Sequence, residues 1–175
     1  MNVTLTIETF DRFLSVRGLT FEATIIGGAA LSVLKIITRE TVDVDCLAPQ
    51  IPKGIINAAE EFRMTYPELK LMKGWLNNGP ENLKIDLGEG WETRLVEIYH
   101  GDALILTTLA RVDLIKTKMF AYCDRQTDLQ DCLALNPDEH ELTLALKWVK
   151  ERDANPEWEK YVEQIFTDFQ TKLKR

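Results

Sequence analysis

The amino-acid sequence predicts an α/β (α+β) protein in which a mixed first half is followed by a helical second half. Over residues 1–108, short runs rich in β-branched residues are separated by apolar residues at helical spacing. Beyond residue 108 only the helical spacing continues. We therefore expect residues 1–108 to form a small sheet with flanking helices, and residues 109–175 to form a helical region packed on it.

The bulk composition is that of a globular protein and excludes several classes. The chain has 175 residues, 45% of them hydrophobic and 28% charged, which is enough for one domain with a sizeable core. Its net charge of −7 argues against a protein that coats nucleic acid, because the phosphate backbone attracts basic surfaces. No apolar run is long enough to span a bilayer and no secretory signal pattern is present, so we expect a cytoplasmic protein with no membrane partner.

Three widely spaced cysteines form no paired C-x-x-C motif, so we expect buried or reduced thiols and no zinc site. They are Cys46, Cys123 and Cys132. We also expect His100 and His140 at the surface, because neither has a neighbour that indicates catalysis.

Helical and alternating patterns follow one another in the first half. Gly18 ends the first helical pattern, and Pro52 suits the first turn of a later helix. The expected elements are a helix at 6–17, a strand at 21–26, a helix at 29–37, a strand at 41–47 and a helix from Pro52 to residue 64.

The middle of the chain is rich in turn residues and gives the weakest signal. There we expect only a short strand, "LKIDL" at 83–87, with Trp75 and Trp91 in the core. Next, "RLVEIY" and "ALILTTL" flank "HGD", which predicts a two-stranded hairpin.

Four helices are expected in the second half. The first has Leu109, Val112, Ile115, Met119 and Tyr122 on one face, and the second begins after Thr127. The last two each start with an Asn-Pro pair, at Asn136 and Asn155, where asparagine is expected to cap the helix and proline to occupy its first turn.

The candidate site lies in residues 24–49, where a strand pattern ends in Gly27 and Gly28 and a helical pattern follows. Without Cβ atoms these residues allow a tight turn and close approach of a ligand, and the start of a helix favours an anion. Asp43 and Asp45 come on the next strand pattern, two residues apart and hence on one face. Paired carboxylates suit Mg²⁺, which prefers oxygen ligands and bridges to substrate phosphates.

Each half of this pattern has a structural alternative. A diglycine is also a common strand-to-helix turn, and an Asp-x-Asp pair is also common on the solvated face of a strand. The order of diglycine, helix and Asp-x-Asp on successive elements is what favours a functional interpretation. A dinucleotide-binding turn is set aside because the G-x-G-x-x-G spacing is absent.

The segment "IIGGAALSVLKIITRETVDVDCLAP", residues 25–49, resembles the signature of the DNA polymerase β-like nucleotidyltransferase superfamily. The chain is similar to small prokaryotic members related to abortive-infection and type IV toxin–antitoxin proteins. Their R-x-T-x-D-x-D block is matched by Arg39, Thr41, Asp43 and Asp45. A later helical motif is matched by Asp113, Lys118, Ala121, Arg125, Asp128 and Asp131, and "GEGWETRLV" at 88–96 is similar to one branch. The likeness covers residues 20–135.

This resemblance implies a small mixed sheet of the nucleotidyltransferase type and transfer of a nucleoside monophosphate from an NTP to a protein or RNA hydroxyl. Asp43 and Asp45 would bind the metals of a two-Mg²⁺ site, and Gly27 and Gly28 would hold the triphosphate. Arg39 and Thr41 would also serve the nucleotide site. A cognate toxin–antitoxin partner is implied as well.

Two features of the resemblance leave alternatives open. Lys118 and Arg125 are candidates for nucleotide contact, but they equally suit pairing with Asp128 or Asp131 to fasten the helical half. The third carboxylate of the superfamily lies on a later strand, for which the sequence offers Asp86, our preference, or Glu97.

The glycine turn also lacks a feature of many active members, which have a serine directly after the first glycine. Here Gly28, Ala29 and Ala30 follow, and none of them has a hydroxyl group. The sequence therefore also allows a second function, a catalytically inactive nucleotidyltransferase-like protein that acts by binding a protein partner.

Overall fold

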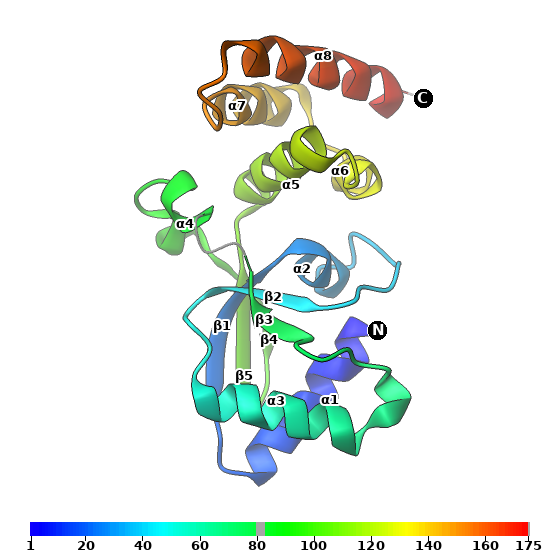
Figure 1. The fold of residues 1–175 in the computed structure, drawn as a ribbon, viewed down its shortest axis with the longest axis vertical. Coiled ribbons are helices and arrows are strands. Elements are labelled where there is room, and N and C mark those ends of the chain that lie inside the picture. The colour runs from blue at the N-terminus through cyan, green and yellow to red at the C-terminus, as the bar shows by residue number, and fades with distance from the viewer. Residues whose placement is uncertain (80–82, 175) are drawn as a thin grey trace. The chain divides into compact units, whose positions relative to one another are not determined.

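The computed structural model describes residues 1–79 and 83–174 and divides the chain into two units, Met1–Leu109 and Ala110–Arg175 (Figure 1). Residues 80–82, part of the turn-rich middle segment, lie outside the described residues.

In the described part of the first unit, five strands form one mixed sheet, which agrees with the expected fold class. The order β3-β2-β1-β5-β4 places β1 at the centre. β1 is parallel to β5 and antiparallel to β2, β3 is parallel to β2, and β4 and β5 form the expected antiparallel hairpin. The strands are β1 (Phe21–Ile26), β2 (Val44–Ala48), β3 (Leu76–Asn78), β4 (Val96–His100) and β5 (Leu104–Thr108).

The helices of the first unit are α1 (Val3–Val16), α2 (Gly27–Val33), α3 (Lys53–Thr65) and the short α4 (Leu83–Asp86). Apolar side chains of α1 and α3 pack against the alternate strand residues of one sheet face and form the core. Phe10, Phe62 and Trp75 meet there with ring centroids 5.1–5.8 Å apart. Burial of Trp75 and of Trp91 confirms the core interpretation of both residues.

The buried carboxylate of Asp11 joins α1 to the turn between β4 and β5. Its Oδ1 accepts hydrogen bonds from the main-chain N–H groups of Ala103, at 2.9 Å, and Leu104, at 2.8 Å, while Oδ2 accepts from Asp102 at 3.3 Å. A Cβ on Gly101 would lie 2.3 Å from Oδ1, so this position of the turn has room only for glycine. Asp11 therefore has a structural role away from the candidate site.

The second unit is helical in its described residues, as expected. Its helices are α5 (Arg111–Arg125), α6 (Leu129–Leu135), α7 (Glu139–Lys150) and α8 (Pro156–Leu173). The side chain of Trp158 donates to the carbonyl of Val149 at 2.9 Å, and the hydroxyl of Tyr161 donates to the carbonyl of Cys123 at 3.0 Å. These bonds join α8 to α7 and to α5.

Two expectations about local structure are wrong. The segment "LKIDL" is not a strand, because it contains α4: Leu83 and Leu87 are buried and Ile85 is 81% exposed. Burial of residues four apart is a helical pattern, whereas a strand would have placed all three on one face.

Asn136 does not cap α7, because it adopts a left-handed conformation (φ 45°) at the end of α6, and Asp138 caps α7 instead. Asn155 does cap α8, with its side chain accepting from Glu157 N at 3.0 Å.

None of the helices in the described chain combines the length and the apolar character that crossing a membrane requires.

Candidate functional site

The two aspartates of the Asp-x-Asp pair lie at the start of β2. Asp45 is within the strand, and Asp43 comes one residue before the strand begins. Val44 and Cys46 belong to the core cluster, so Asp45 faces away from the core. Asp45 is opposite Ile26 of β1 on one side and opposite Asn77 of β3 on the other. The residue before the diglycine is thus the direct strand neighbour of Asp45.

Two glycines from different parts of the chain confine the side chain of Asp45. A Cβ on Gly27, which has φ 74°, would lie 3.2 Å from Oδ2 of Asp45. A Cβ on Gly79 would lie 2.9 Å from the Cβ of Asp45 and 3.5 Å from its Oδ1. Both glycines bring main chain close to the carboxylate, and Gly79 was not predicted from the sequence.

Gly28 is in similar close contact with the loop that precedes β2. A Cβ there would lie 2.9 Å from Cγ2 of Thr41 and 3.3 Å from Nη2 of Arg39. The guanidinium of Arg39 therefore lies beside the first turn of α2, and this places a positive charge next to the diglycine. The sequence motif and the fold bring Gly27, Gly28, Arg39 and Asp45 together in one place.

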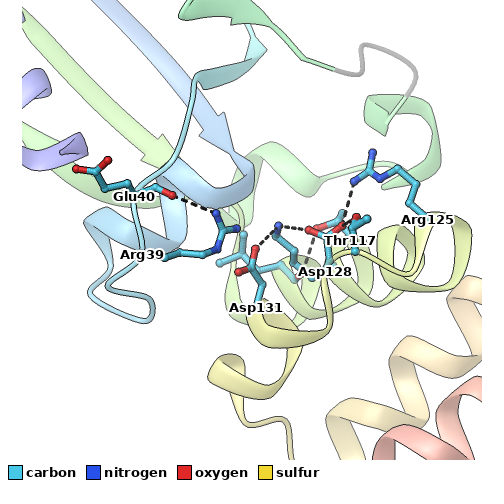
Figure 2. A network of polar contacts seen from close by, with 9 residues as sticks. Arg39, Glu40, Thr117, Arg125, Asp128 and Asp131 are labelled. Atoms are coloured by element: carbon cyan, nitrogen blue, oxygen red, sulfur yellow. Dashed lines mark hydrogen bonds and ion pairs between the residues drawn. The ribbon is translucent and has the colours of Figure 1, made fainter. Parts of the chain in front are cut away.

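Main-chain contacts shape the same loop. Nη1 of Arg39 donates to the carbonyl of Glu40 at 3.4 Å (Figure 2), and Oγ1 of Thr41 donates to the carbonyl of Asp43 at 3.4 Å. Thr41 is buried, so its hydroxyl serves the loop, while its methyl group packs against Gly28. Thr41 thus holds Asp43 near the turn through the backbone.

β3 contributes two asparagines that no pattern in the sequence indicated. The amide orientation of Asn77 that satisfies its hydrogen bonds has Nδ2 donating to Oδ1 of Asp45 at 3.2 Å and to the carbonyl of Asn78 at 3.1 Å. Asn78 accepts from Ile51 N at 3.0 Å and donates to the carbonyls of Cys46 and Pro49. Asn77 therefore belongs to the candidate site, and Asn78 fastens β3 to the loop after β2.

The two candidates for a third carboxylate come from different elements of the first unit. Asp86 is the last residue of α4 and so is not on a strand. Glu97 is on β4, and strands β1 and β5 separate β4 from β2. At a strand spacing of about 4.8 Å, three spacings put Glu97 roughly 14 Å across the sheet from Asp45. Oε2 of Glu97 instead lies within hydrogen-bond distance of Nδ1 of His100, at 3.1 Å, and both side chains are exposed.

Lys118 and Arg125 lie on α5 in the second unit, where carboxylates pair with both. Nζ of Lys118 donates to Oδ1 of Asp128 at 2.7 Å and to Oδ2 of Asp131 at 2.8 Å. Nη2 of Arg125 donates to Oδ2 of Asp128 at 3.2 Å (Figure 2). These contacts correspond to the structural alternative, in which the two cations fasten α5 to the start of α6.

The pKa values in this group follow from its contacts. Burial alone would lower the pKa of Lys118, but the hydrogen bonds to Asp128 and Asp131 outweigh it and raise that pKa. Burial would raise the pKa of Asp128, but the hydrogen bond and charge of Lys118, with help from Arg125, lower it overall. Both shifts favour the charged forms, as expected for an ionic network.

The cysteines are free and buried. Burial is the largest cause that raises the pKa of each thiol, to about 11 for Cys46 and about 12 for Cys123 and Cys132. Such thiols are poor nucleophiles at neutral pH.

The donor set around Asp45 fits a magnesium ion that also binds substrate phosphate. Among the described residues no group of three or more His, Cys, Asp or Glu side chains is arranged to hold a metal. Asp43 and Asp45 would together supply two carboxylates at the start of β2. Mg²⁺ in proteins is commonly bound by one or two carboxylates and completed by waters and substrate phosphates. The nearby main chain of Gly27 and the guanidinium of Arg39 are groups of the kinds that bind phosphate oxygens in proteins.

A comparison with known protein families gives a match to the segment that contains these residues. A family model described as "Nucleotidyltransferase of unknown function (DUF6036)" matches residues 5–137. The matched region contains the diglycine turn, the Asp-x-Asp pair, β3 and the Lys118 network, and it ends before α7. No curated protein and no solved structure matches the chain.

Proposed function

The chain belongs to the nucleotidyltransferase family whose model spans residues 5–137, and from this membership we propose a Mg²⁺-dependent transfer of a nucleoside monophosphate from an NTP to a hydroxyl group. The observation that carries the proposal is the closeness of the Asp45 carboxylate to Gly27, the first residue of α2, where a Cβ would lie only 3.2 Å from Oδ2. A carboxylate this close to a glycine turn brings a metal ligand and a phosphate-binding backbone to one place.

The residues of the first unit have distinct roles in this proposal. Asp43 and Asp45 hold the magnesium ion, which when bound neutralises phosphate charge and polarises the α-phosphoryl group. The main chain at Gly27 and Gly28 and the guanidinium of Arg39 bind the phosphate oxygens of the NTP. Thr41 fixes the loop between them through the carbonyl of Asp43.

The bond changes are those of an in-line displacement at phosphorus. The acceptor hydroxyl oxygen forms a bond to the α-phosphorus and gives up its proton to solvent. The bond from the α-phosphorus to the bridging oxygen breaks, and pyrophosphate leaves with that electron pair. Because the transferred group passes directly to the acceptor, the chain itself is not modified and acts by positioning and charge neutralisation.

The acceptor class and biological setting are part of the same proposal. A hydroxyl of protein or RNA and a toxin–antitoxin or defence role are supported by the similarity of the Arg39–Asp45 block to such proteins. Labelled NTP added to a cell extract with the purified protein tests the acceptor class, since label appears in either the protein or the RNA fraction. Growth arrest on expression, relieved by a neighbouring gene, tests the toxin–antitoxin relation.

Calorimetric titration of the four NTPs, with and without Mg²⁺, tests the nucleotide site itself. We expect metal-dependent binding of at least one NTP to the wild type and its loss in Asp43→Ala/Asp45→Ala. The matched control is Glu97→Ala/Asp102→Ala, which removes two exposed carboxylates of the same unit and is expected to bind as the wild type does. Absence of NTP binding by the folded wild type would contradict the proposal and favour the inactive scaffold.

A further inference from the structure

In the amide orientation that satisfies its hydrogen bonds, Asn77 has both of its N–H groups engaged next to the Asp-x-Asp pair. One donates to Oδ1 of Asp45 at 3.2 Å and the other to the carbonyl of Asn78 at 3.1 Å. An NH₂ group has two donors, so these two bonds fix the plane of the amide. The position is also fixed by the main chain, because Asp45 and Asn77 are direct partners in the parallel pairing of β2 and β3.

The two oxygens of Asp45 consequently have different surroundings. Oδ1 lies on the side of Asn77 and Gly79, and Oδ2 lies on the side of Gly27. The phosphate-binding turn is therefore next to Oδ2, while Oδ1 is tied to β3. A carboxylate oriented by a fixed donor is a common way in which proteins aim a metal ligand.

Asn77 also determines the charge of the site. An aspartate has nearly the shape of an asparagine, so Asp at position 77 would place a third carboxylate within hydrogen-bond distance of Asp45. Two carboxylates so close repel unless a cation lies between them. With asparagine, the strand next to β2 contributes a neutral donor and the site keeps two acidic ligands.

We infer that Asn77 is a positioning residue for Asp45, and that by keeping β3 neutral it makes the metal enter together with the triphosphate instead of as a free ion. This inference rests on the proposed function for the identity of the triphosphate ligand. The contact that it invokes, from amide to carboxylate, stands without it. The ligand class is a divalent cation complexed with a phosphate chain.

Manganese is a suitable probe, because its unbound ion is counted directly by electron paramagnetic resonance. We expect the wild type to bind free Mn²⁺ weakly and Asn77→Asp to bind it on the order of tenfold or more tightly, since affinity for such ions rises with the number of charged ligands. Asn77→Ala should bind more weakly than the wild type, because Asp45 loses its orienting donor. Opposite effects of the two variants cannot arise from a role in folding alone.

A second titration tests the joint entry of metal and phosphate. Inorganic tripolyphosphate is expected to increase Mn²⁺ binding by the wild type. The increase should be smaller in Asn77→Asp, because that variant binds the ion without phosphate. The control is Asn57→Asp, which adds the same charge at an exposed position of α3 and should behave as the wild type does.

The outcomes separate this inference from the proposed function. If Asn77→Asp and the wild type bind free Mn²⁺ with the same affinity, the inference is wrong even when NTP binding is observed. If Asn77→Asp gains affinity but no variant binds an NTP, the role of Asn77 holds and the nucleotidyltransferase proposal fails.

Discussion

Oδ2 of Asp45 lies 3.2 Å from the point where a Cβ on Gly27 would be, so the carboxylate and the turn occupy adjoining space with no side chain between them. Gly27 also has φ 74°, a conformation that residues with a Cβ rarely adopt. The lack of space for a side chain beside Asp45 and the positive φ both require glycine at position 27, which explains why the strand-to-helix turn begins with this residue.

Gly27→Ala should therefore affect both stability and binding. We expect a loss of about 1–2 kcal/mol in the free energy of unfolding from backbone strain, and loss of metal-dependent NTP binding because the new methyl group meets Asp45. Urea denaturation and calorimetry measure the two effects. Gly18→Ala is the matched control: Gly18 has φ 63° with nothing within 4 Å of its Cβ position, so it should lose stability and keep binding.

Removal of the Asp11 carboxylate should destabilise the first unit without involving the candidate site. In Asp11→Ala two main-chain N–H groups, those of Ala103 and Leu104, lose their buried acceptor. We expect a loss of about 2–4 kcal/mol, measured as the urea midpoint of unfolding. Asp102→Ala, an exposed carboxylate in the same turn, should change stability little, and equal losses in the two variants would contradict this account.

The Lys118 network should respond strongly to loss of its cation. Lys118→Met leaves Asp128 and Asp131 without their shared buried partner, for which we expect a loss of about 3–5 kcal/mol. Lys147→Met removes an exposed lysine of α7 and is the control. If Lys118→Met proved as stable as Lys147→Met, the lysine would have a role other than fastening α5 to α6.

The same network predicts a pH window for the stability of the second unit. The pKa of Asp128 is lowered from its ordinary 3.8, so its contribution is present above that value and lost as pH falls through the lower folded-state pKa. The pKa of Lys118 is raised from its ordinary 10.5, so its contribution is present below that value and lost as pH rises through the higher folded-state pKa. Thermal unfolding followed from acid to alkaline pH should show both losses in the wild type and smaller losses in Lys118→Met/Asp128→Ala.

The N-cap of α7 is Asp138 and not Asn136, which the sequence pattern had predicted, and this difference can be tested. Asp138 accepts from Glu141 N at 2.8 Å, and the Glu141 side chain accepts from Asp138 N at 3.0 Å. Asp138→Ala should lose about 1 kcal/mol, whereas Asn136→Gly should be neutral or stabilising because Asn136 is in a left-handed conformation. A larger loss from Asn136→Gly than from Asp138→Ala would contradict the structure.

Much of the fold was predictable because strong periodicity marks its elements. β1 agrees with its predicted range, and the hairpin of β4 and β5 and the four helices of the second unit were expected. β3 was missed because "LNN" is too short to show alternation, and asparagine is uncommon in strands. A strand was predicted in place of α4 because Leu83, Ile85 and Leu87 alternate with polar residues. Only burial shows that Ile85 does not share the face of Leu83 and Leu87.

Only the part of the candidate site that lies in one continuous segment of the sequence was predictable. Gly27, Gly28, Arg39 and Asp45 are close in sequence, and their local order indicated that they would meet. Asn77 and Gly79 come from a distant segment, so their approach to Asp45 depends on the parallel pairing of β3 with β2. Pairing between distant strands is determined by the whole sheet, and it leaves no local pattern in the sequence.

The central position of β1 has a consequence for synthesis of the chain. β1 is made early, but its parallel partner β5 joins it through pairs such as Thr24 and Thr107, 83 residues apart. Until β5 leaves the ribosome, one edge of the most buried strand remains open, and open strand edges invite pairing with other chains. A nascent chain of this protein that stalls before residue 104 should therefore depend on chaperones, whereas release a few residues after β5 should let the first unit close its sheet.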